Sequence, residues 1–155
     1  MQAFEGERIF SLRPEQLWPK LRDASYLAAC IPDGTPHLGA TRDKAVCTVR
    51  PGFSFMRGSL DVTIAVIGSE EPISVKFSLI SKGIGSSSEV ETALTLVPHE
   101  QGTKVQWRAE VKNLGGLLKM VPSGLIRGAS QKVIEDVWKG VADRILSEPE
   151  AQAKS

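Results

Sequence analysis

Few side chains in this chain are able to carry acid-base, nucleophilic or metal chemistry near neutral pH. The 155 residues include two histidines, His37 and His99, and two cysteines, Cys30 and Cys47. Zinc sites in proteins use three or four such ligands at close spacing, and these four residues do not provide that spacing. The sequence therefore predicts no metal site and no cofactor, and no motif in it identifies a catalytic residue.

The two histidines lie in different contexts. His99 is part of Pro98-His99-Glu100-Gln101-Gly102, which is typical of an exposed hairpin tip. His37, in Thr35-Pro36-His37-Leu38, begins or precedes a strand and could reach the mouth of a cavity. Because isolated loop histidines are usually solvated, both solvation and ligand contact stay open for His37.

Both cysteines have apolar neighbours. Cys30 stands among Ala28, Ala29 and Ile31, and Cys47 alternates in phase with other apolar residues. Free cysteine is among the most buried residue types, so packing is the expected role of both, with a reactive Cys30 thiol as the alternative. Two cysteines and no secretion signal favour reduced thiols over a disulfide.

Composition limits the classes of partner. Nineteen Lys and Arg residues against 18 Asp and Glu residues give a formal net charge of +1, so no basic surface for nucleic acid is predicted. No stretch approaches the roughly 18 apolar residues of a membrane span. We expect a cytoplasmic protein with a single domain over residues 1–147 and a disordered tail over 148–155.

Alternating apolar and polar residues predict an antiparallel sheet with one wet face. A strand over 3–12 is followed by two short helices, over 15–22 and 24–29. The further strands are predicted over 45–50, 60–67, 73–80, 89–97 and 103–112. Gly83-Ile84-Gly85-Ser86 lacks the helix that a phosphate-binding loop needs, so a hairpin turn is predicted there.

One long amphipathic helix is predicted at the end of the chain, over about 116–147. Its apolar positions cover about half of its circumference and are Ile126, Ala129, Val133, Ile134, Val137, Trp138, Val141 and Ile145. A stripe this broad suits a helix gripped by a curved sheet. The fold class is therefore α+β, with a curved antiparallel sheet of about six to seven strands wrapped around this helix, and such an arrangement often leaves a cavity.

Four stretches of the sequence resemble the carbon monoxide dehydrogenase G-subunit (CoxG) family. They are Phe4-Glu5-Gly6, Leu27-Ala28-Ala29-Cys30-Ile31-Pro32, Lys82-Gly83-Ile84-Gly85-Ser86, and the segment from Gly102-Thr103-Lys104-Val105 to Gly115-Gly116. This family is a branch of the START-related helix-grip superfamily, which includes polyketide cyclases and pollen-allergen-like proteins. Asp33 departs from the family pattern, because it interrupts the usual proline-glycine pair.

The resemblance implies a helix-grip fold with an apolar cavity. It also implies an accessory role for a molybdenum hydroxylase of the carbon monoxide dehydrogenase type, in membrane recruitment, maturation or quinone delivery. Many family members have a long, partly apolar C-terminal extension, whereas this sequence ends in Glu148-Pro149-Glu150-Ala151-Gln152-Ala153-Lys154-Ser155. No membrane span is therefore expected, and any membrane contact would be peripheral.

The first hypothesis is a non-enzymatic accessory protein that binds an apolar ligand, a quinone or a lipid. Tyr26, His37 and Arg57 are the polar groups expected to orient its head group. The expected cavity wall consists of Val62, Ile64, Val75, Phe77, Leu94, Trp107, Leu118, Val121 and Leu125. The simple alternative is an interior that side chains fill completely. The nine aromatic residues of the chain are a modest number for this and slightly favour a cavity.

Two other classes of function stay open. One is an enzyme of the cyclase or dehydratase type, with His37 or Tyr26 as proton donor, because fold alone does not decide function. The other is a pure docking module for a partner enzyme. Gly124 and Gly128 weaken the first half of the final helix, so residues 117–128 could act as a gate over the cavity, unless these glycines instead pack closely against the sheet.

Overall fold

The computed structural model describes residues 2–31, 34–50 and 58–148. One seven-stranded antiparallel sheet has the order β1-β7-β6-β5-β4-β3-β2. Its strands are β1 (Ala3–Phe10), β2 (Thr35–Pro36), β3 (Lys44–Val49), β4 (Leu60–Glu70), β5 (Ser74–Gly83), β6 (Ser86–His99) and β7 (Gly102–Gly116). The helices are α1 (Pro14–Leu21), α2 (Ala24–Cys30), the 3-10 helix η1 (Leu117–Met120) and α3 (Ser123–Ser147).

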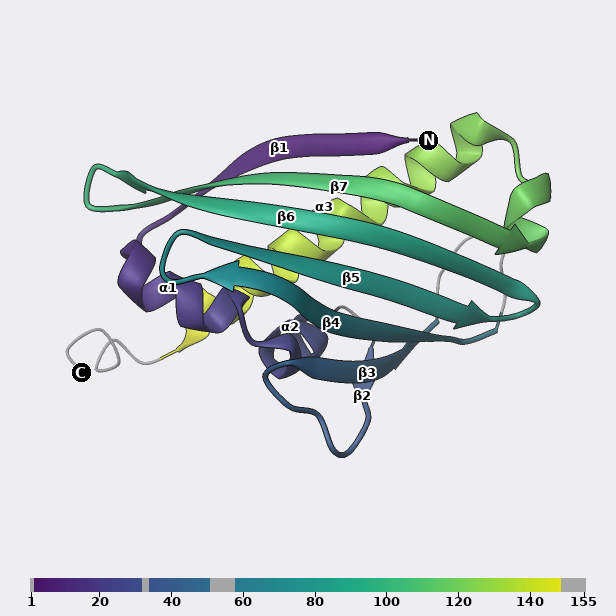
Figure 1. The fold of residues 1–155 in the computed structure, drawn as a ribbon, viewed down its shortest axis with the longest axis horizontal. Helices are drawn as coiled ribbons and strands as arrows, with labels where there is room; N and C mark the ends of the chain where they lie inside the picture. The colour runs from purple at the N-terminus through teal and green to yellow at the C-terminus, as the bar shows by residue number, and fades with distance from the viewer. Residues whose placement is uncertain (1, 32–33, 51–57, 149–155) are drawn as a thin grey trace.

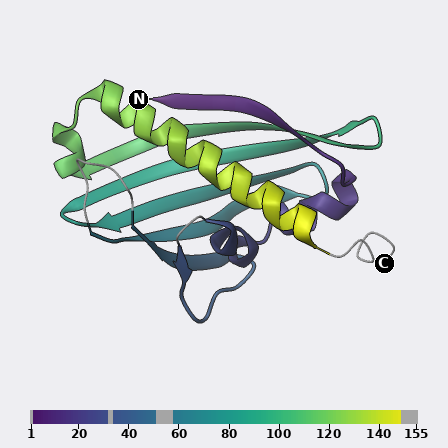
Figure 2. The same cartoon turned by 180° about the vertical axis from the view of Figure 1, so that it is seen from behind.

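The sheet is covered on one face by α3, which crosses the strands diagonally (Figures 1 and 2). We call this covered side the inner face. In β5, Val75 and Phe77 are 2% and 4% exposed and share a hydrophobic cluster with Trp138 of α3. Lys76, which lies between them in the sequence, is exposed and points to the opposite side, as the two-residue period of a strand requires. The predicted α+β architecture is confirmed.

Local signals in the sequence define the two short helices. In α1, Pro14 stands in the first turn, where its missing N–H costs no hydrogen bond. Asp23 caps α2, because its carboxylate accepts hydrogen bonds from the backbone N–H groups of Ser25 and Tyr26 at 3.0 and 3.3 Å. Helix α1 lies at the end of the molecule opposite η1, whereas α2 lies nearer its middle, beside the C-terminal half of α3 (Figures 1 and 2).

The final helix begins later than the sequence pattern predicts. Strand β7 continues to Gly116, whose φ of 61° turns the chain, and a continuous helix starts only at Ser123. Pro122 explains the break, because proline disfavours a helical conformation in the preceding residue, and Val121 is extended with φ −81° and ψ 131°. The prediction of one helix over 116–147 is therefore wrong for its first seven residues.

Strands β4 to β7 all extend beyond their predicted bounds, and the difference matters for the site in β5 and β6. Strand β5 ends at Gly83 rather than at residue 80, and β6 begins at Ser86 rather than at residue 89. The turn between them is the predicted hairpin, with positive φ at Gly83, Ile84 and Gly85. Most of the extra residues are serines, whose side chains therefore project from the faces of the sheet.

The hydrophobic core consists of two clusters of unequal size. The large cluster joins α1, α2 and the second half of α3 to the middle strands, and Leu17, Leu21 and Val105 within it are 0% exposed. The small cluster contains Leu60, Leu118 and Ile126, with partly buried residues around them. It lies near η1, so the two clusters stabilise opposite ends of the sheet-helix interface.

Glycines in two settings should respond oppositely to substitution by alanine. A Cβ at Gly102 would overlap the Phe10 carbonyl oxygen, whereas a Cβ at Gly128 would meet nothing within 4 Å. We expect Gly102→Ala to lower the free energy of unfolding by about 1–3 kcal/mol through steric overlap. Gly128→Ala should raise it by about 1 kcal/mol, since alanine favours the helix. Urea denaturation measures both, and a stabilising Gly102→Ala would contradict the overlap.

Candidate ligand-binding site

The residues predicted to form a cavity wall fall into three groups. Ile64, Val75, Phe77 and Leu94 are at most 4% exposed and belong to the large cluster, on which the partly buried Val62 and Trp107 pack. Leu118 and Val121 belong to the small cluster. Leu125 is 52% exposed, which leaves it outside both clusters.

A row of four inner-face residues crosses the sheet between the two clusters. Val62 of β4 pairs with Ser81 of β5, which pairs with Ser88 of β6, which pairs with Leu114 of β7. We call these four residues the serine row. All four are partly exposed, although they lie on the face that α3 covers. Water therefore reaches the inner face at this row.

The next positions along the same strands are also incompletely covered. Leu79, Val90 and Thr92 continue the inner face from the serine row toward the large cluster, and all three are partly exposed. Leu79 packs against the large cluster, whereas Val90 belongs to neither cluster. Because well-packed interiors bury their side chains almost completely, this stretch of the inner face is less completely covered than the clusters on either side of it.

The facing part of α3 carries small side chains. Between Ile126, which is 7% exposed, and the half-buried Ile134, the helix presents only Ala129 and Ser130 as partly buried residues. No atom lies within 4 Å of a Cβ built on Gly124 or Gly128, so these glycines do not pack closely against the sheet. Both glycines are exposed, so the small side chains that face the sheet here are those of Ala129 and Ser130.

The polar character of this face comes from hydroxyl groups. Ser81 and Ser88 hydrogen-bond to each other through their hydroxyl oxygens, and Thr92 is the other hydroxyl residue between the clusters. Among the described residues, the inner-face positions of β4 to β7 include no Asp, Glu, His, Lys or Arg. These positions of β4 to β7 are therefore apolar or neutral, and Ser81, Ser88 and Thr92 are the hydroxyl residues in the stretch between the clusters.

One further polar atom is buried deeper along the sheet. The Nε1 of Trp107 is buried and has no hydrogen-bond partner among the described residues. Its indole ring lies 6.3 Å from that of Trp138, and Gly6 leaves space for it, because a Cβ there would lie 2.8 Å from the ring. Buried donors normally have a partner, so this N–H is available to an acceptor.

The three residues predicted to hold a head group are not brought together at this face. His37 lies at the sheet edge, where its Nε2 is 2.6 Å from Thr48 Oγ1 and 3.8 Å from Asp61 Oδ1. Thr48 and Asp61 alternate with the inner-face residues Cys47 and Val62, so His37 lies against the outer face. Arg57 falls outside the described residues.

Tyr26 lies at the far end of the molecule, beside the C-terminus of α3. The guanidinium carbon of Arg144 is 4.1 Å from the centre of its ring, and Lys20, which forms an ion pair of 2.6 Å with Glu148, is 5.3 Å from it. The hydroxyl oxygen is buried without a hydrogen-bond partner in the described part of the chain. Burial, and then the nearby Glu148 carboxylate, raise the pKa of Tyr26 above its usual range.

This raised pKa predicts a loss of stability at alkaline pH. The folded protein favours the neutral phenol, so its stabilising effect is complete below the ordinary pKa of 10.0 and is lost as the pH rises above it. We expect the free energy of unfolding to fall between about pH 9 and 11, and to fall less steeply in Tyr26→Phe. Urea titrations over this range measure it; equal slopes would contradict the prediction.

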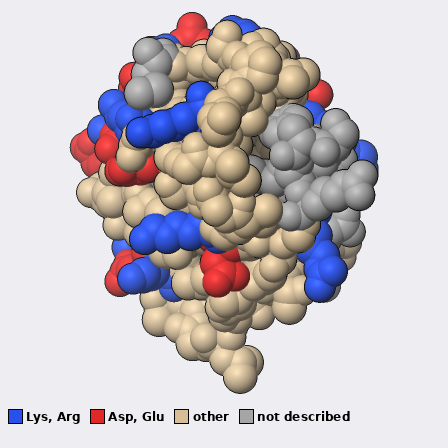
Figure 3. Space-filling view, turned by 90° about the vertical axis from the view of Figure 1, so that its right-hand side faces the viewer, with Lys and Arg blue, Asp and Glu red and all other residues tan. Residues whose placement is uncertain are grey.

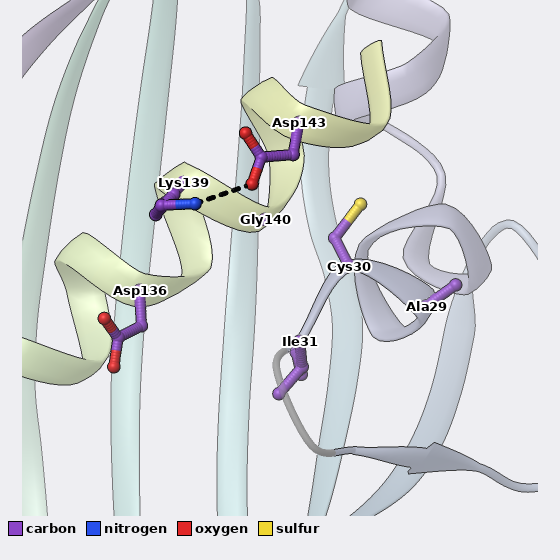
Figure 4. A pocket seen from close by; sticks show the side chains of 7 residues that line it. All are labelled: Ala29, Cys30, Ile31, Asp136, Lys139, Gly140 and Asp143. Atoms are coloured by element: carbon purple, nitrogen blue, oxygen red, sulfur yellow. Dashed lines mark hydrogen bonds and ion pairs between the residues drawn. The ribbon is translucent and has the colours of Figure 1, made fainter. Parts of the chain in front are cut away.

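Both cysteines are free and buried, as predicted. Burial raises the pKa of the Cys30 and Cys47 thiols, which lowers the fraction of reactive thiolate at neutral pH. Cys30 also lines an open pocket of about 470 Å³ between α2 and α3 (Figure 4). Lys139 and Asp143, which form an ion pair of 2.8 Å there, are 75% and 61% exposed, so this pocket is a charged surface feature.

The described residues contain neither a cluster of metal ligands nor a membrane-spanning helix. Nowhere among residues 2–31, 34–50 and 58–148 do three His, Cys, Asp or Glu side chains gather as metal ligands would. Within the same ranges, no helix is both long enough and apolar enough to cross a bilayer.

Solved structures with the same fold come from several sources. A conserved protein from Geobacillus kaustophilus has a TM-score of 0.80 at 22% identity, with 94% of this chain and 95% of that chain covered. A START superfamily protein from Mycobacterium smegmatis has a TM-score of 0.64 at 13% identity, with coverage of 92% and 95%. For Ara h 8.0201 the TM-score is 0.65 at 15% identity, with coverage of 95% and 99%. These likenesses establish the helix-grip fold.

A comparison with curated proteins gives no match. The family model of the carbon monoxide dehydrogenase G subunit (CoxG) matches residues 6–146, which is nearly the whole described chain. The match includes all four stretches that carry the resemblance in the sequence, apart from the first two residues of Phe4-Glu5-Gly6. This chain therefore belongs to the carbon monoxide dehydrogenase G-subunit (CoxG) family.

Proposed function

We propose that this protein binds a neutral, largely apolar small molecule, a quinone or a lipid, between the inner face of its sheet and the first half of α3. The observation that carries the proposal is the partly exposed stretch of inner face between the two core clusters, from the serine row to Thr92. Concave, mostly apolar sites with a few polar groups are typical of small-molecule binding.

The end of the molecule nearest to this stretch supports entry of an apolar ligand. Leu117 and Met120 of η1 are 56% and 80% exposed, and Leu125 of α3 is 52% exposed. Much of the face seen in Figure 3 is uncharged, with Lys, Arg, Asp and Glu side chains around and between its uncharged parts. Exposed apolar patches of this kind mark interaction sites, so ligand exchange should occur at this end, under the proposed gate formed by residues 117–128.

Family membership supports the biological role. In the CoxG family the resemblance implies an accessory to a molybdenum hydroxylase of the carbon monoxide dehydrogenase type, and we propose the same role here. The enzyme alternative has less support, since the described inner-face positions of β4 to β7 carry no titratable acid-base pair. Of the two proton donors named for that alternative, His37 lies against the outer face, and Tyr26 lies beside Arg144 near the C-terminus of α3.

Native mass spectrometry of the protein purified from its own source tests the proposal, followed by organic extraction of any bound molecule. A quinone or lipid that co-purifies would support it. An empty protein that captures a molybdenum hydroxylase would instead favour a pure docking module. An empty protein that also fails to bind any added apolar probe would contradict ligand binding.

A further inference from the structure

We infer that the paired hydroxyls of Ser81 and Ser88 anchor one neutral oxygen function of the ligand, a carbonyl or a hydroxyl. This inference rests on the proposed function and specifies which end of the ligand is polar. The two serines are direct partners across β5 and β6, and their hydroxyls hydrogen-bond to each other. Both are partly exposed on the inner face.

The hydrogen-bonding capacity of this pair is only partly used. Each serine hydroxyl has one donor and two acceptor positions, and the bond between Ser81 and Ser88 uses one donor and one acceptor. One O–H and three acceptor positions are left for a bound molecule. The pair can therefore donate to a ligand carbonyl, or exchange hydrogen bonds with a ligand hydroxyl.

The surroundings of the pair select an uncharged group. Val62 and Leu114 flank the serines in the same row, and the described inner-face positions of β4 to β7 include no cationic residue. A carboxylate buried without a cationic partner loses its hydration and gains no compensating ion pair. The site should therefore prefer a ketone or an alcohol over a fatty acid of the same length.

The position of the pair also gives the ligand a direction. Ser88 and Thr92 are four positions apart in β6, which is about 13 Å of strand. Between them, Leu79 and Val90 provide partly exposed apolar surface. With the oxygen function at the serine row, the apolar chain of the ligand extends along this surface toward the large cluster and Trp107.

A displacement titration tests this anchor. The fluorescent hydrocarbon diphenylhexatriene occupies the apolar surface of the full chain, and decan-2-one, decane or decanoate then displaces it. The test variant is Ser81→Ala with Ser88→Ala. Its matched control is Ser78→Ala with Ser87→Ala, which makes the same changes on the same two strands but on the outer face.

We expect the affinity of the test variant for decan-2-one to fall about five- to tenfold, as loss of a neutral hydrogen bond predicts. Its affinity for decane should be unchanged, and the control variant should match the wild type. The wild type should also bind decanoate more weakly than decan-2-one. Circular dichroism of both variants checks that they fold.

Two results would overturn the anchor while leaving ligand binding intact. One is an unchanged affinity of the test variant for decan-2-one, and the other is a wild type that prefers decanoate. Failure of the wild type to bind diphenylhexatriene and decane at all would overturn the proposed function itself. The two hypotheses therefore fail through different measurements.

Discussion

Replacement of Thr92 by phenylalanine is expected to weaken ligand binding about thirtyfold without unfolding the protein. Thr92 lies on the inner face between the clusters, is partly exposed, and pairs with Phe77 on one side and Ala109 on the other. A phenyl ring there would occupy the space proposed for the ligand. Overlap with the ring should make the binding free energy of the ligand less favourable by about 2 kcal/mol, a typical cost of overpacking. This corresponds to an affinity about thirtyfold lower. Diphenylhexatriene titration measures the loss.

The matched control for this substitution is Thr95→Phe. Thr95 belongs to the same strand and is exposed on the outer face, so its replacement should leave the affinity at the wild-type value. Urea denaturation should give Thr92→Phe a free energy of unfolding equal to or above that of the wild type, because the added ring fills incompletely packed space. Undiminished binding by Thr92→Phe would show that ligands bind elsewhere.

Trp138→Ala should produce the largest loss of stability among substitutions in α3. Trp138 is 8% exposed, and its ring centre lies 6.0 Å from that of Phe10 in β1 and 6.3 Å from that of Trp107 in β7. Truncation of a buried aromatic residue costs about 3–5 kcal/mol, a large part of the roughly 5–15 kcal/mol that stabilises a typical domain. Thermal or urea unfolding measures this loss.

Val133→Ala provides the comparison on the same helix. Val133 is 47% exposed, so its truncation removes little buried surface and gains a few tenths of a kcal/mol of helix propensity. We expect a change within about 0.5 kcal/mol. If Trp138→Ala lost no more stability than Val133→Ala, the aromatic contacts would not hold α3 to the sheet.

The fold can be predicted from the sequence because alternation and amphipathicity both act over many residues. Val75 and Phe77 point inward in the phase that the alternation predicts, and Trp138 and Val141 are buried on the predicted stripe of the helix. The start of the helix is harder to predict, since apolar residues continue on the N-terminal side of Ser123. Pro122 is the local signal that marks the break.

The candidate site is harder to predict than the fold, because its polar residues resemble a turn. Serines are common in turns, so the predicted strands end at residue 80 and begin again at residue 89, which excludes Ser81 and Ser88. Their phase is the available signal: Ser81 follows Leu79, and Ser88 precedes Val90, at the two-residue spacing of the inner face. The side on which His37 lies depends on the pairing of the two-residue β2 with β3, which no local pattern reveals.

The sheet order has a consequence for biosynthesis. Strand β1 is made first but pairs with β7, as in the pairing of Ala3 with Glu110. At a ribosomal rate of about 5–20 residues per second, β1 waits roughly 5–20 s for its partner strand to be made. During this interval its backbone hydrogen-bonding groups are unpaired, and the charged side chains of Glu5, Glu7 and Arg8 oppose association with other nascent chains.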